Sequence, residues 1–409
     1  MALIVQKYGG TSVGSIEKIK RVAERVIEYY KKGDRLVVVL SAMAGQTDSL
    51  IRLSREITDT PDTRELDVLM ATGEQVSVSL FAMAVKSMGY DCSSLLAFQT
   101  AIHTDQIYGK ARIRKVETDR ILRELDENRI IAVAGFQGID EKKNITTLGR
   151  GGSDTTAVAL AAALKADLCE IFTDVEGVFS ADPNICTHAR KLERISYEEM
   201  LEFASLGAKV LDIRSVEFAK KFNVPLHVRS SFLKSEGTMV LTESKEMEKV
   251  MVSGVVYDKN EARITITKVP DRPGISFKIF DPVFKAGVVV DMIVQNTSVE
   301  GLTDLTFTVT KTDFQKTIKL LKEVAQEIGA EKVLGDQNIS KVSIVGLGMR
   351  NHAGVASKMF ETLSKENINI SMISTSEIKI SCIIEEKYTE LATRALHEAF
   401  GLGNEKEKK

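Results

Sequence analysis

The sequence has few cysteines and histidines, and neither residue is spaced for a metal site. Its four cysteines are scattered without a Cys-x-x-Cys pair, and its five histidines form no His-Glu-x-x-His pattern. Zinc sites and disulfide frameworks depend on such spacings. We therefore expect no built-in metal and a chain that suits a reducing cytoplasm.

Long apolar runs and an excess of one charge are absent too. Runs such as 36–40 and 130–134 are far shorter than the roughly 20 residues that span a bilayer. The N-terminal segment lacks the regions of a signal peptide. Lys and Arg total 55 against 57 Asp and Glu, which gives a net charge of −2. We expect a cytoplasmic protein that acts neither on nucleic acids nor at membranes.

Three familiar nucleotide-binding patterns are also missing. The chain contains no Gly-x-x-x-x-Gly-Lys-Ser/Thr, no Gly-x-Gly-x-x-Gly and no His-Arg-Asp loop of the protein-kinase kind. Any phosphate site must therefore belong to another class. At 409 residues, 44% of them hydrophobic, the chain is long enough for two or three globular domains.

Up to about residue 245, short apolar runs alternate with helical periodicity. A helix is predicted over 66–88, closed by Gly89, and Ser196 with Glu199 forms a capping box before the last long helical region. The alternation predicts an α/β fold whose mainly parallel sheet is covered on both faces. The predicted strands are 3–6, 36–40, 95–98, 130–134, 171–173 and 226–228.

The rest of the chain contains an internal repeat at a constant offset of 80 residues. Asp271-Arg-Pro-Gly274 corresponds to Asn351-His-Ala-Gly354, and the matches run on to Met292-Ile293 and Met372-Ile373 without a gap. Glycine, aromatic and apolar spacings all coincide. We interpret this as two tandem copies of one unit rather than a chance likeness of two helices.

Two glycine-rich segments each connect a predicted strand to a helix. Lys7-Tyr-Gly-Gly-Thr-Ser12 follows the first strand, and Thr147–Thr156 leads into an alanine-rich helix over 157–164. Ligands of open α/β sheets bind at the carboxyl ends of strands, where glycines let backbone N–H groups approach an anion. Lys7 would supply a point charge for a phosphate. The plainer alternative is an ordinary turn beside a solvated lysine.

The second glycine-rich segment carries charged side chains of its own. Arg150 offers a rigid fork for a carboxylate or phosphate, and Ser153 or Asp154 would cap the helix. A third loop, Thr173–Pro183, is rich in Asp, Gly and Pro and suits the edge of a nucleotide, or is a surface turn.

The order of these segments resembles that of the aspartate kinases in the amino-acid kinase family, and the tandem repeat resembles their paired ACT domains. The resemblance covers essentially the whole chain, and the C-terminal half is especially similar to that of the lysine- and threonine-regulated type. The segments that carry it are Lys7–Gly14, Phe136-Gln-Gly138, Thr147–Thr156, Thr173–Pro183 and Ser196–Lys221.

The resemblance implies a three-layer amino-acid-kinase fold followed by two ferredoxin-like α+β units. The implied boundaries are 1–245 for the kinase domain and 263–335 and 340–409 for the ACT domains, with a strand in 250–262 that packs with either unit. The charged stretch 243–249 is the expected linker.

The implied reaction transfers the γ-phosphoryl group of ATP, accompanied by Mg²⁺, to the β-carboxylate of L-aspartate. This is the first step of lysine, threonine and methionine biosynthesis. The nucleophile is already ionised at neutral pH, with a pKa of about 3.9, so no general base is needed. Positioning and charge neutralisation should dominate.

By carry-over, Lys7 would stabilise the transferring group and Asp154 would orient Lys7. Phosphate and nucleotide contacts are expected from Gly9, Gly10, Ser41, Thr173, Asp174, Phe179, Asp182 and Lys209. Aspartate contacts are expected from Thr47, Glu74, Arg150 and Ser153, with Glu74 accepting the substrate ammonium.

Two departures from the family pattern concern the nucleotide side. Phe179 stands where many relatives have Tyr, and Asn184 where they have Arg. In addition, Val210-Leu-Asp-Ile-Arg214 replaces a more usual Val-Leu-His-Pro-Arg.

The resemblance further implies feedback inhibition by lysine, threonine or both through the ACT units, and a homodimer or tetramer. A separate regulatory subunit started at Met247 is an open alternative. Effector contacts are expected from Asp271, Asp291, Gln295, Asn351 and Asn369. Two rival functions are another amino-acid kinase, acting on glutamate, N-acetylglutamate or a nucleotide, and a non-catalytic amino-acid sensor. Lys7, Arg150 and Asp154 together disfavour the sensor.

Overall fold

The computed structural model describes residues 1–208, 210–244, 247, 250–296, 301–352 and 354–403, apart from the side chain of residue 351. The chain divides into two compact units. Unit 1 comprises residues 1–178, 191–205 and 209–247. Unit 2 comprises residues 179–190, 206–208 and 248–409. Each unit is described by itself.

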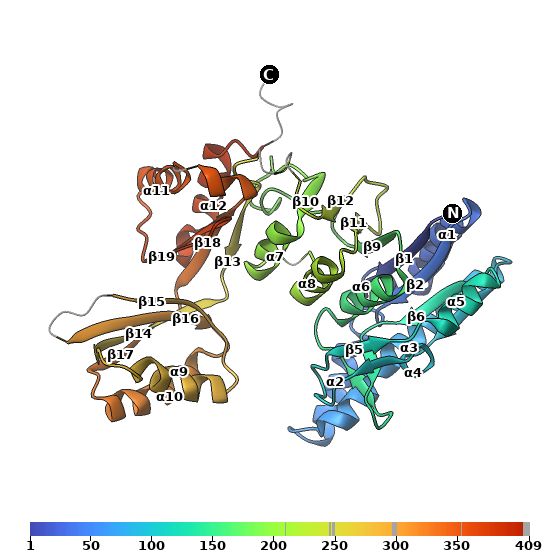
Figure 1. Cartoon of the computed structure of the whole chain (residues 1–409), viewed down its shortest axis with the longest axis horizontal. Coiled ribbons are helices and arrows are strands. Elements are labelled where there is room, and N and C mark those ends of the chain that lie inside the picture. Colours follow the sequence, from blue (N-terminus) through green and yellow to red (C-terminus); the bar gives the residue numbers. More distant parts are fainter. Residues whose placement is uncertain (209, 245–246, 248–249, 297–300, 353, 404–409) are drawn as a thin grey trace. The chain divides into compact units, whose positions relative to one another are not determined.

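The main sheet of unit 1 has eight strands in the order β10-β12-β11-β9-β1-β2-β6-β3 (Figure 1). All neighbours are parallel except β11 and β12, which confirms the mainly parallel sheet. The strands are β1 (Leu3–Tyr8), β2 (Arg35–Leu40), β3 (Cys92–Leu95), β6 (Ile130–Ala134), β9 (Leu168–Thr173), β10 (Arg194–Ser196), β11 (Leu226–Ser230) and β12 (Thr238–Leu241).

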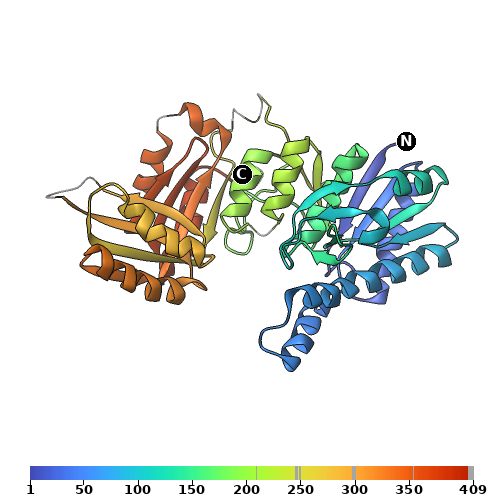
Figure 2. The same ribbon diagram turned by 60° about the horizontal axis from the view of Figure 1, so that its bottom comes forward.

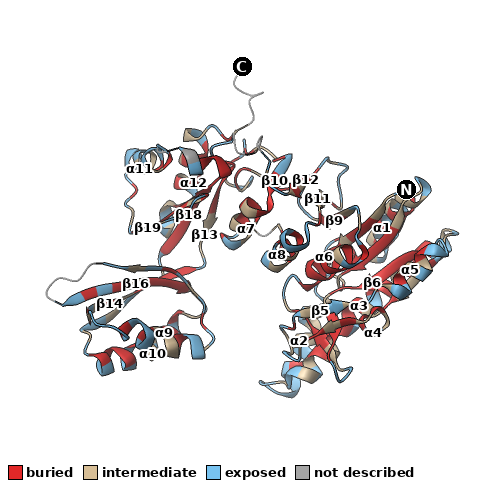
Figure 3. Cartoon of the chain, in the orientation of Figure 1, coloured by how far each residue is buried: buried red, intermediate tan, exposed pale blue. Residues whose placement is uncertain are grey.

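Helices cover both faces of this sheet because its central strands are apolar on both sides. Every residue of β6 is buried, as Figure 3 shows for the middle of the sheet. Helices α1 (Ile16–Lys31) and α3 (Thr63–Ser87) bury their apolar sides against one face. Helix α6 (Gly152–Leu164) packs on β1, β2 and β9 from the other face, with α8 (Ile213–Phe222) beside it.

A smaller four-stranded sheet completes unit 1, in the order β5-β4-β7-β8. Its strands are β4 (Ile102–Thr104), β5 (Ile113–Val116), β7 (Gln137–Ile139) and β8 (Ile145–Thr147). The remaining helices are α2 (Gln46–Ile57), α4 (Ala97–Thr100), α5 (Asp119–Asp126) and α7 (Tyr197–Ser205).

Two local predictions in unit 1 are wrong. The strand expected at 95–98 ends at Leu95 and gives way to α4, because the Gln99 side chain accepts the Leu96 N–H and starts a turn. Neither Ser153 nor Asp154 caps α6, whose N-cap is Gly151.

The capping box at Ser196 is confirmed. The Ser196 hydroxyl accepts the Glu199 N–H at 3.1 Å, and the Glu199 carboxylate accepts the Ser196 N–H at 3.1 Å. These reciprocal bonds satisfy two donors at the start of α7.

Helix α3 is the one described helix that is long and apolar enough to cross a membrane by length and composition. Charged and polar residues interrupt it, so no long unbroken apolar run marks it in the sequence. Half of its most apolar stretch is buried, and the buried Asp67 and Glu74 lie along it. The core helix of a globular unit passes the same test, so the finding is weak evidence for a span.

Unit 2 contains two four-stranded antiparallel sheets, each with two helices, which confirms the two ferredoxin-like units. The first has the order β15-β16-β14-β17, and Figures 1 and 2 show its two helices together on one face. Its elements are β14 (Glu261–Pro270), α9 (Ile275–Lys285), β15 (Val290–Gln295), β16 (Leu302–Thr310), α10 (Phe314–Ile328) and β17 (Lys332–Asp336).

The second sheet has the order β13-β18-β20-β19. Its strand β13 precedes the whole first ACT unit in the chain. Strand β13 pairs with β18, so the first unit is inserted into the second. Helices α9 and α11 begin and end 80 residues apart, as the repeat predicts. The elements are β13 (Gly254–Asp258), β18 (Ile339–Val345), α11 (Val355–Lys365), β19 (Met372–Thr375), β20 (Lys379–Glu385) and α12 (Thr389–Ala399).

Candidate active site

Lys7 and Asp154 form a shielded ion pair at the carboxyl end of the main sheet. Lys7 Nζ lies 2.6 Å from Asp154 Oδ1, and the two side chains are 12% and 11% exposed. Lys7 is near the end of β1, and Asp154 is in the first turn of α6. Because little water reaches this pair, the electrostatic interactions of both charges are screened less than at an exposed surface.

The turn after β1 packs directly on the turn after β2. A Cβ added to Gly10 would lie 2.8 Å from the Ala42 carbonyl oxygen, so this approach requires glycine. The Ala44 N–H donates to the Gly10 carbonyl at 3.2 Å, and the Ser41 N–H donates to the Tyr8 carbonyl at 3.1 Å. The structure thus brings Lys7, Gly10 and Ser41 to one edge of the sheet. The Gly9 N–H donates to the Phe172 carbonyl, at 3.4 Å.

Glu74 on α3 is a buried carboxylate with one free oxygen. It is 3% exposed; Oε1 accepts the Ala42 N–H at 3.0 Å, while Oε2 has no hydrogen-bond partner within the described residues. Burial raises the pKa of Glu74 to about 7, against the opposing effect of the Ala42 bond. A free buried carboxylate oxygen suits a ligand's ammonium group. Thr47 lies in the first turn of α2, half-buried.

The Arg150 loop is held through its backbone, which leaves its side chain exposed. The Arg150 carbonyl accepts a hydrogen bond from Arg214 Nη2 at 2.5 Å. Gly151 has a φ of +68°, and an added Cβ would lie 2.2 Å from the Asp212 side chain. Ser153 follows in the first turn of α6, 7% exposed.

Sequence reasoning missed Arg214 as a residue of this site. Asp212 accepts the Arg214 N–H at 3.1 Å as the N-cap of α8, and this places the Arg214 guanidinium against the loop. The signal in the sequence is Asp212 directly before this helix, because Asp is a favoured N-cap residue.

Two of the predicted nucleotide contacts lie at the end of β9 in unit 1: Thr173 is its last residue, and Asp174 follows it. The Thr173 hydroxyl donates to Asp174 Oδ1 at 3.0 Å, and the Thr173 carbonyl accepts the Ser231 N–H at 2.7 Å. Asp174 is exposed. Lys209, a third predicted contact, lies outside the described residues.

Phe179 and Asp182 belong to unit 2, although they lie within the range 1–245 expected for the kinase domain. Both Asp182 oxygens are engaged there: Oδ1 accepts the Asn184 N–H at 2.9 Å and Oδ2 accepts the Tyr257 hydroxyl at 2.9 Å. Phe179 packs against a small apolar cluster that includes Cys186. Their role as nucleotide contacts stays a prediction.

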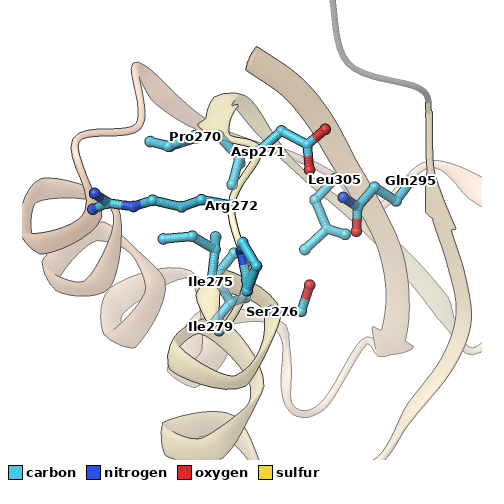
Figure 4. Close-up of a pocket in the computed structure, with 11 residues that line it drawn as sticks. Pro270, Asp271, Arg272, Ile275, Ser276, Ile279, Gln295 and Leu305 are labelled. Atoms are coloured by element: carbon cyan, nitrogen blue, oxygen red, sulfur yellow. The ribbon is translucent and has the colours of Figure 1, made fainter. Parts of the chain in front are cut away.

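Two of the predicted effector residues line one cavity of about 270 Å³ beside α9. Figure 4 shows the Asp271 carboxyl and the Gln295 amide on one side of it, with Arg272 extending the opposite way. Such a volume is slightly below the roughly 300–1,000 Å³ of drug-sized ligands, and suits a single amino acid. The lining also includes Pro270, Gly274, Ile275, Ser276, Ile279 and Leu305.

Among the other predicted effector residues, Asp291 and Asn369 do not line this cavity. The Asp291 carboxylate pairs with the buried Lys341, which also contacts Glu261. Asn369 is exposed before β19. The side chain of Asn351 lies outside the described residues.

Comparisons with known proteins match the whole chain. Residues 2–230 match the amino acid kinase family, and residues 263–328 and 342–400 each match an ACT domain. An aspartate kinase of Pseudomonas putida is 57% identical over 98% of both chains. An aspartokinase of Mycolicibacterium smegmatis is 48% identical over 100% of this chain and 98% of its own.

A solved structure has the same architecture. E. coli aspartokinase III, in complex with aspartate and ADP, is 25% identical with a TM-score of 0.81, over 97% of this chain and 99% of that one.

Proposed function

The chain belongs to the aspartate kinases of the amino acid kinase family, and we propose that it transfers the γ-phosphoryl group of ATP to the β-carboxylate of L-aspartate. The products are 4-phospho-L-aspartate and ADP, and the step opens the synthesis of lysine, threonine and methionine. The ACT domains make it an allosteric enzyme.

One observation carries the proposal: Ala42 connects the two halves of the site. Its N–H binds Glu74, and its carbonyl oxygen packs against Gly10 in the turn that follows Lys7. A cationic group for a phosphate and a carboxylate for an ammonium are therefore built around one short turn.

The residues of unit 1 perform positioning and charge neutralisation. The aspartate β-carboxylate is already anionic, so its approach to the triphosphate is opposed by charge repulsion rather than by a proton. Lys7, oriented by Asp154, stabilises the transferring phosphoryl group beside the amides of Gly9 and Gly10. Ser41, Thr173 and Asp174 complete the ATP contacts of unit 1 in this proposal, and contacts from Phe179, Asp182 and Lys209 stay predictions.

The second substrate is held by opposite charges at its two ends. Glu74 accepts the aspartate ammonium through its free Oε2, and Arg150 forms a fork for a carboxylate. Thr47 and Ser153 lie beside them in this proposal. The same pocket would disfavour N-acetylglutamate, which has no ammonium for Glu74.

Magnesium accompanies ATP in this proposal, held largely by phosphate oxygens and water, and it neutralises phosphate charge when bound. The described residues contain no group of three or more His, Cys, Asp or Glu side chains that could hold a metal ion. A cation with few protein ligands fits this donor set, because Mg²⁺ keeps several waters.

Lysine, threonine or both are the proposed effectors, bound in the cavity with Asp271 and Gln295. The Asp271 carboxyl suits an effector ammonium, and the Gln295 amide can donate to its carboxylate. Effector binding would favour a form of the chain with poor substrate affinity.

We also propose a homodimer or tetramer through the ACT domains, in the cytoplasm. Strands β15 and β19 are edge strands of their sheets and can pair with another chain. The four cysteines are free and buried, as suits a reducing compartment. A regulatory subunit started at Met247 would begin where unit 1 ends.

The substrate is tested by trapping the acyl phosphate with hydroxylamine. Aspartate, glutamate and N-acetylglutamate are each supplied with ATP and Mg²⁺. Hydroxamate from aspartate alone supports the proposal. Product from another acid keeps the phosphate site but reassigns the Arg150 and Glu74 pocket. No product from any acid, despite ATP binding, favours an amino-acid sensor.

A further inference from the structure

Asp67 is a fully buried carboxylate on α3 that neither substrate contacts in the proposal above. It is 0% exposed. Its Oδ1 accepts the Thr147 hydroxyl at 2.7 Å, and its Oδ2 accepts the Thr147 N–H at 2.8 Å and the Gly109 N–H at 2.9 Å. One charged group thus joins the end of β8 to the turn at Gly109.

The two joined segments lead directly into the Arg150 loop. The Ala111 N–H donates to the Thr147 carbonyl at 2.9 Å. Two residues further on, a Cβ added to Gly149 would lie 2.9 Å from the Gly109 carbonyl oxygen. The two backbones therefore stay in contact up to the residue before Arg150.

The same side of α3 reaches two other segments of the site. Asp67, Ala71 and Glu74 are spaced at i, i+4 and i+7, which places them on one side of a helix. The Ala71 carbonyl accepts a hydrogen bond from Gln137 Nε2 at 3.1 Å, and Glu74 accepts the Ala42 N–H. Helix α3 thus ties the Arg150 loop, strand β7 and the Ala42 turn to one rigid element.

We infer that Asp67 is a positioning residue for aspartate binding: it fixes the backbone from which Arg150 reaches the substrate carboxylate. This rests on the proposed role of Arg150. The groups around the Asp67 carboxylate are all donors, and a carboxylate has only acceptor positions. Burial raises the pKa of Asp67, while the bonds from Thr147 and Gly109 oppose that rise.

The test is Asp67→Asn in the full chain, with KM measured separately for aspartate and for ATP. The amide keeps the size of the side chain but turns an N–H toward a donor. We expect the KM for aspartate to rise about tenfold and the KM for ATP to change by less than about twofold. An equal rise in both KM values, or none, would overturn the inference.

Glu199→Gln is the matched control. Glu199 is also a buried carboxylate that accepts backbone and hydroxyl hydrogen bonds, but it does so at the start of α7. Glu199→Gln should lower the midpoint of thermal unfolding while leaving the KM for aspartate unchanged. If it raises that KM as much as Asp67→Asn does, general destabilisation explains the effect and the inference fails.

Two further variants keep the test decisive. Thr147→Val removes only the hydroxyl bond to Asp67, so it stays informative if Asp67→Asn does not fold; it should raise the KM for aspartate by a smaller factor, and no rise counts against the inference. Arg150→Lys tests the premise. If Arg150→Lys raises this KM and Asp67→Asn does not, only the inference is wrong. If Arg150→Lys leaves it unchanged, both are wrong.

Discussion

At the scale of single residues, Glu74 is the group whose charge we expect to respond most to aspartate. Among the described residues its Oε2 has no hydrogen-bond partner, and burial raises the pKa of this carboxyl to about 7. A bound ammonium would stabilise the ionised form and lower that pKa again. Aspartate binding should therefore be linked to the release of a proton from Glu74 below neutral pH.

This linkage predicts a pH-dependent KM for aspartate. Below pH 7 Glu74 is increasingly protonated and cannot pair with the ammonium, so the KM should rise as the pH falls, by about tenfold per unit well below the pKa. The substrate's own β-carboxyl, with a pKa of about 3.9, stays ionised over most of this range. Initial rates of ADP release from pH 5.5 to 8 measure the effect.

Glu74→Gln provides the comparison for that profile. The amide cannot ionise, so its KM should be high at every pH and almost flat. A wild-type KM that does not change between pH 5.5 and 8 would show that Glu74 does not receive the ammonium.

Site residues that stand in a local motif could be proposed from the sequence. Residues that hydrogen-bond to backbone groups far away in the sequence could not. Lys7 and Asp154 stand in glycine-rich segments, and the structure places their charged atoms 2.6 Å apart. Asp67 contacts a residue 80 positions away, and Arg214 contacts one 64 positions away. No local periodicity encodes such pairs, because the fold alone brings them together.

At the scale of elements, Gly151 shows how closely the Arg150 loop approaches α8. Its φ of +68° is unfavourable for other residues, and a Cβ would overlap the Asp212 side chain at 2.2 Å. The loop thus depends on both backbone freedom and the absence of a side chain at this position.

Gly151→Ala should lower the free energy of unfolding by roughly 2–5 kcal/mol, the sum of left-handed strain and overpacking. It should also raise the KM for aspartate by displacing Arg150. Gly89→Ala is the control, since Gly89 has a φ of +87° but nothing within 4 Å of its added Cβ. For both variants, urea unfolding measures the loss of stability and steady-state kinetics measure the KM for aspartate. Equal losses of stability would refute the role of close packing.

The repeat predicted the ACT helices well, but it could not say which ACT unit the strand expected in 250–262 would join. An offset of 80 residues places α11 correctly from α9. Strand β13 lies before both copies and has no counterpart in the pattern. It can close the second sheet because Val255 and Val256 are buried and its backbone pairs along β18.

At the scale of the whole molecule, the two compact units do not correspond to two consecutive stretches of the sequence. Residues 179–190 come from the kinase half but belong to unit 2. There the Ser180 hydroxyl donates to the Leu402 carbonyl at 3.0 Å and lies 3.0 Å from His397 Nε2. The predicted nucleotide loop, Thr173–Pro183, is thus shared by the catalytic and the regulatory unit.

The loop is divided within its own length: Thr173 and Asp174 are in unit 1, whereas Phe179 and Asp182 are in unit 2.

The central claim is that one chain combines an aspartate-phosphorylating site with a separate amino-acid-sensing site. Asp271→Ala removes a carboxyl from the proposed effector cavity, and Asp281→Ala is its control, because Asp281 on α9 pairs with Lys285 and does not line that cavity.

The most direct measurement is hydroxamate formation from aspartate by wild type and both variants, with lysine and threonine added singly and together. We expect wild type and Asp281→Ala to be inhibited alike. Asp271→Ala should need at least about tenfold more effector while its uninhibited turnover stays within about twofold of wild type. If Asp271→Ala loses turnover and inhibition together, or remains as sensitive as wild type, the two sites are not separable as described.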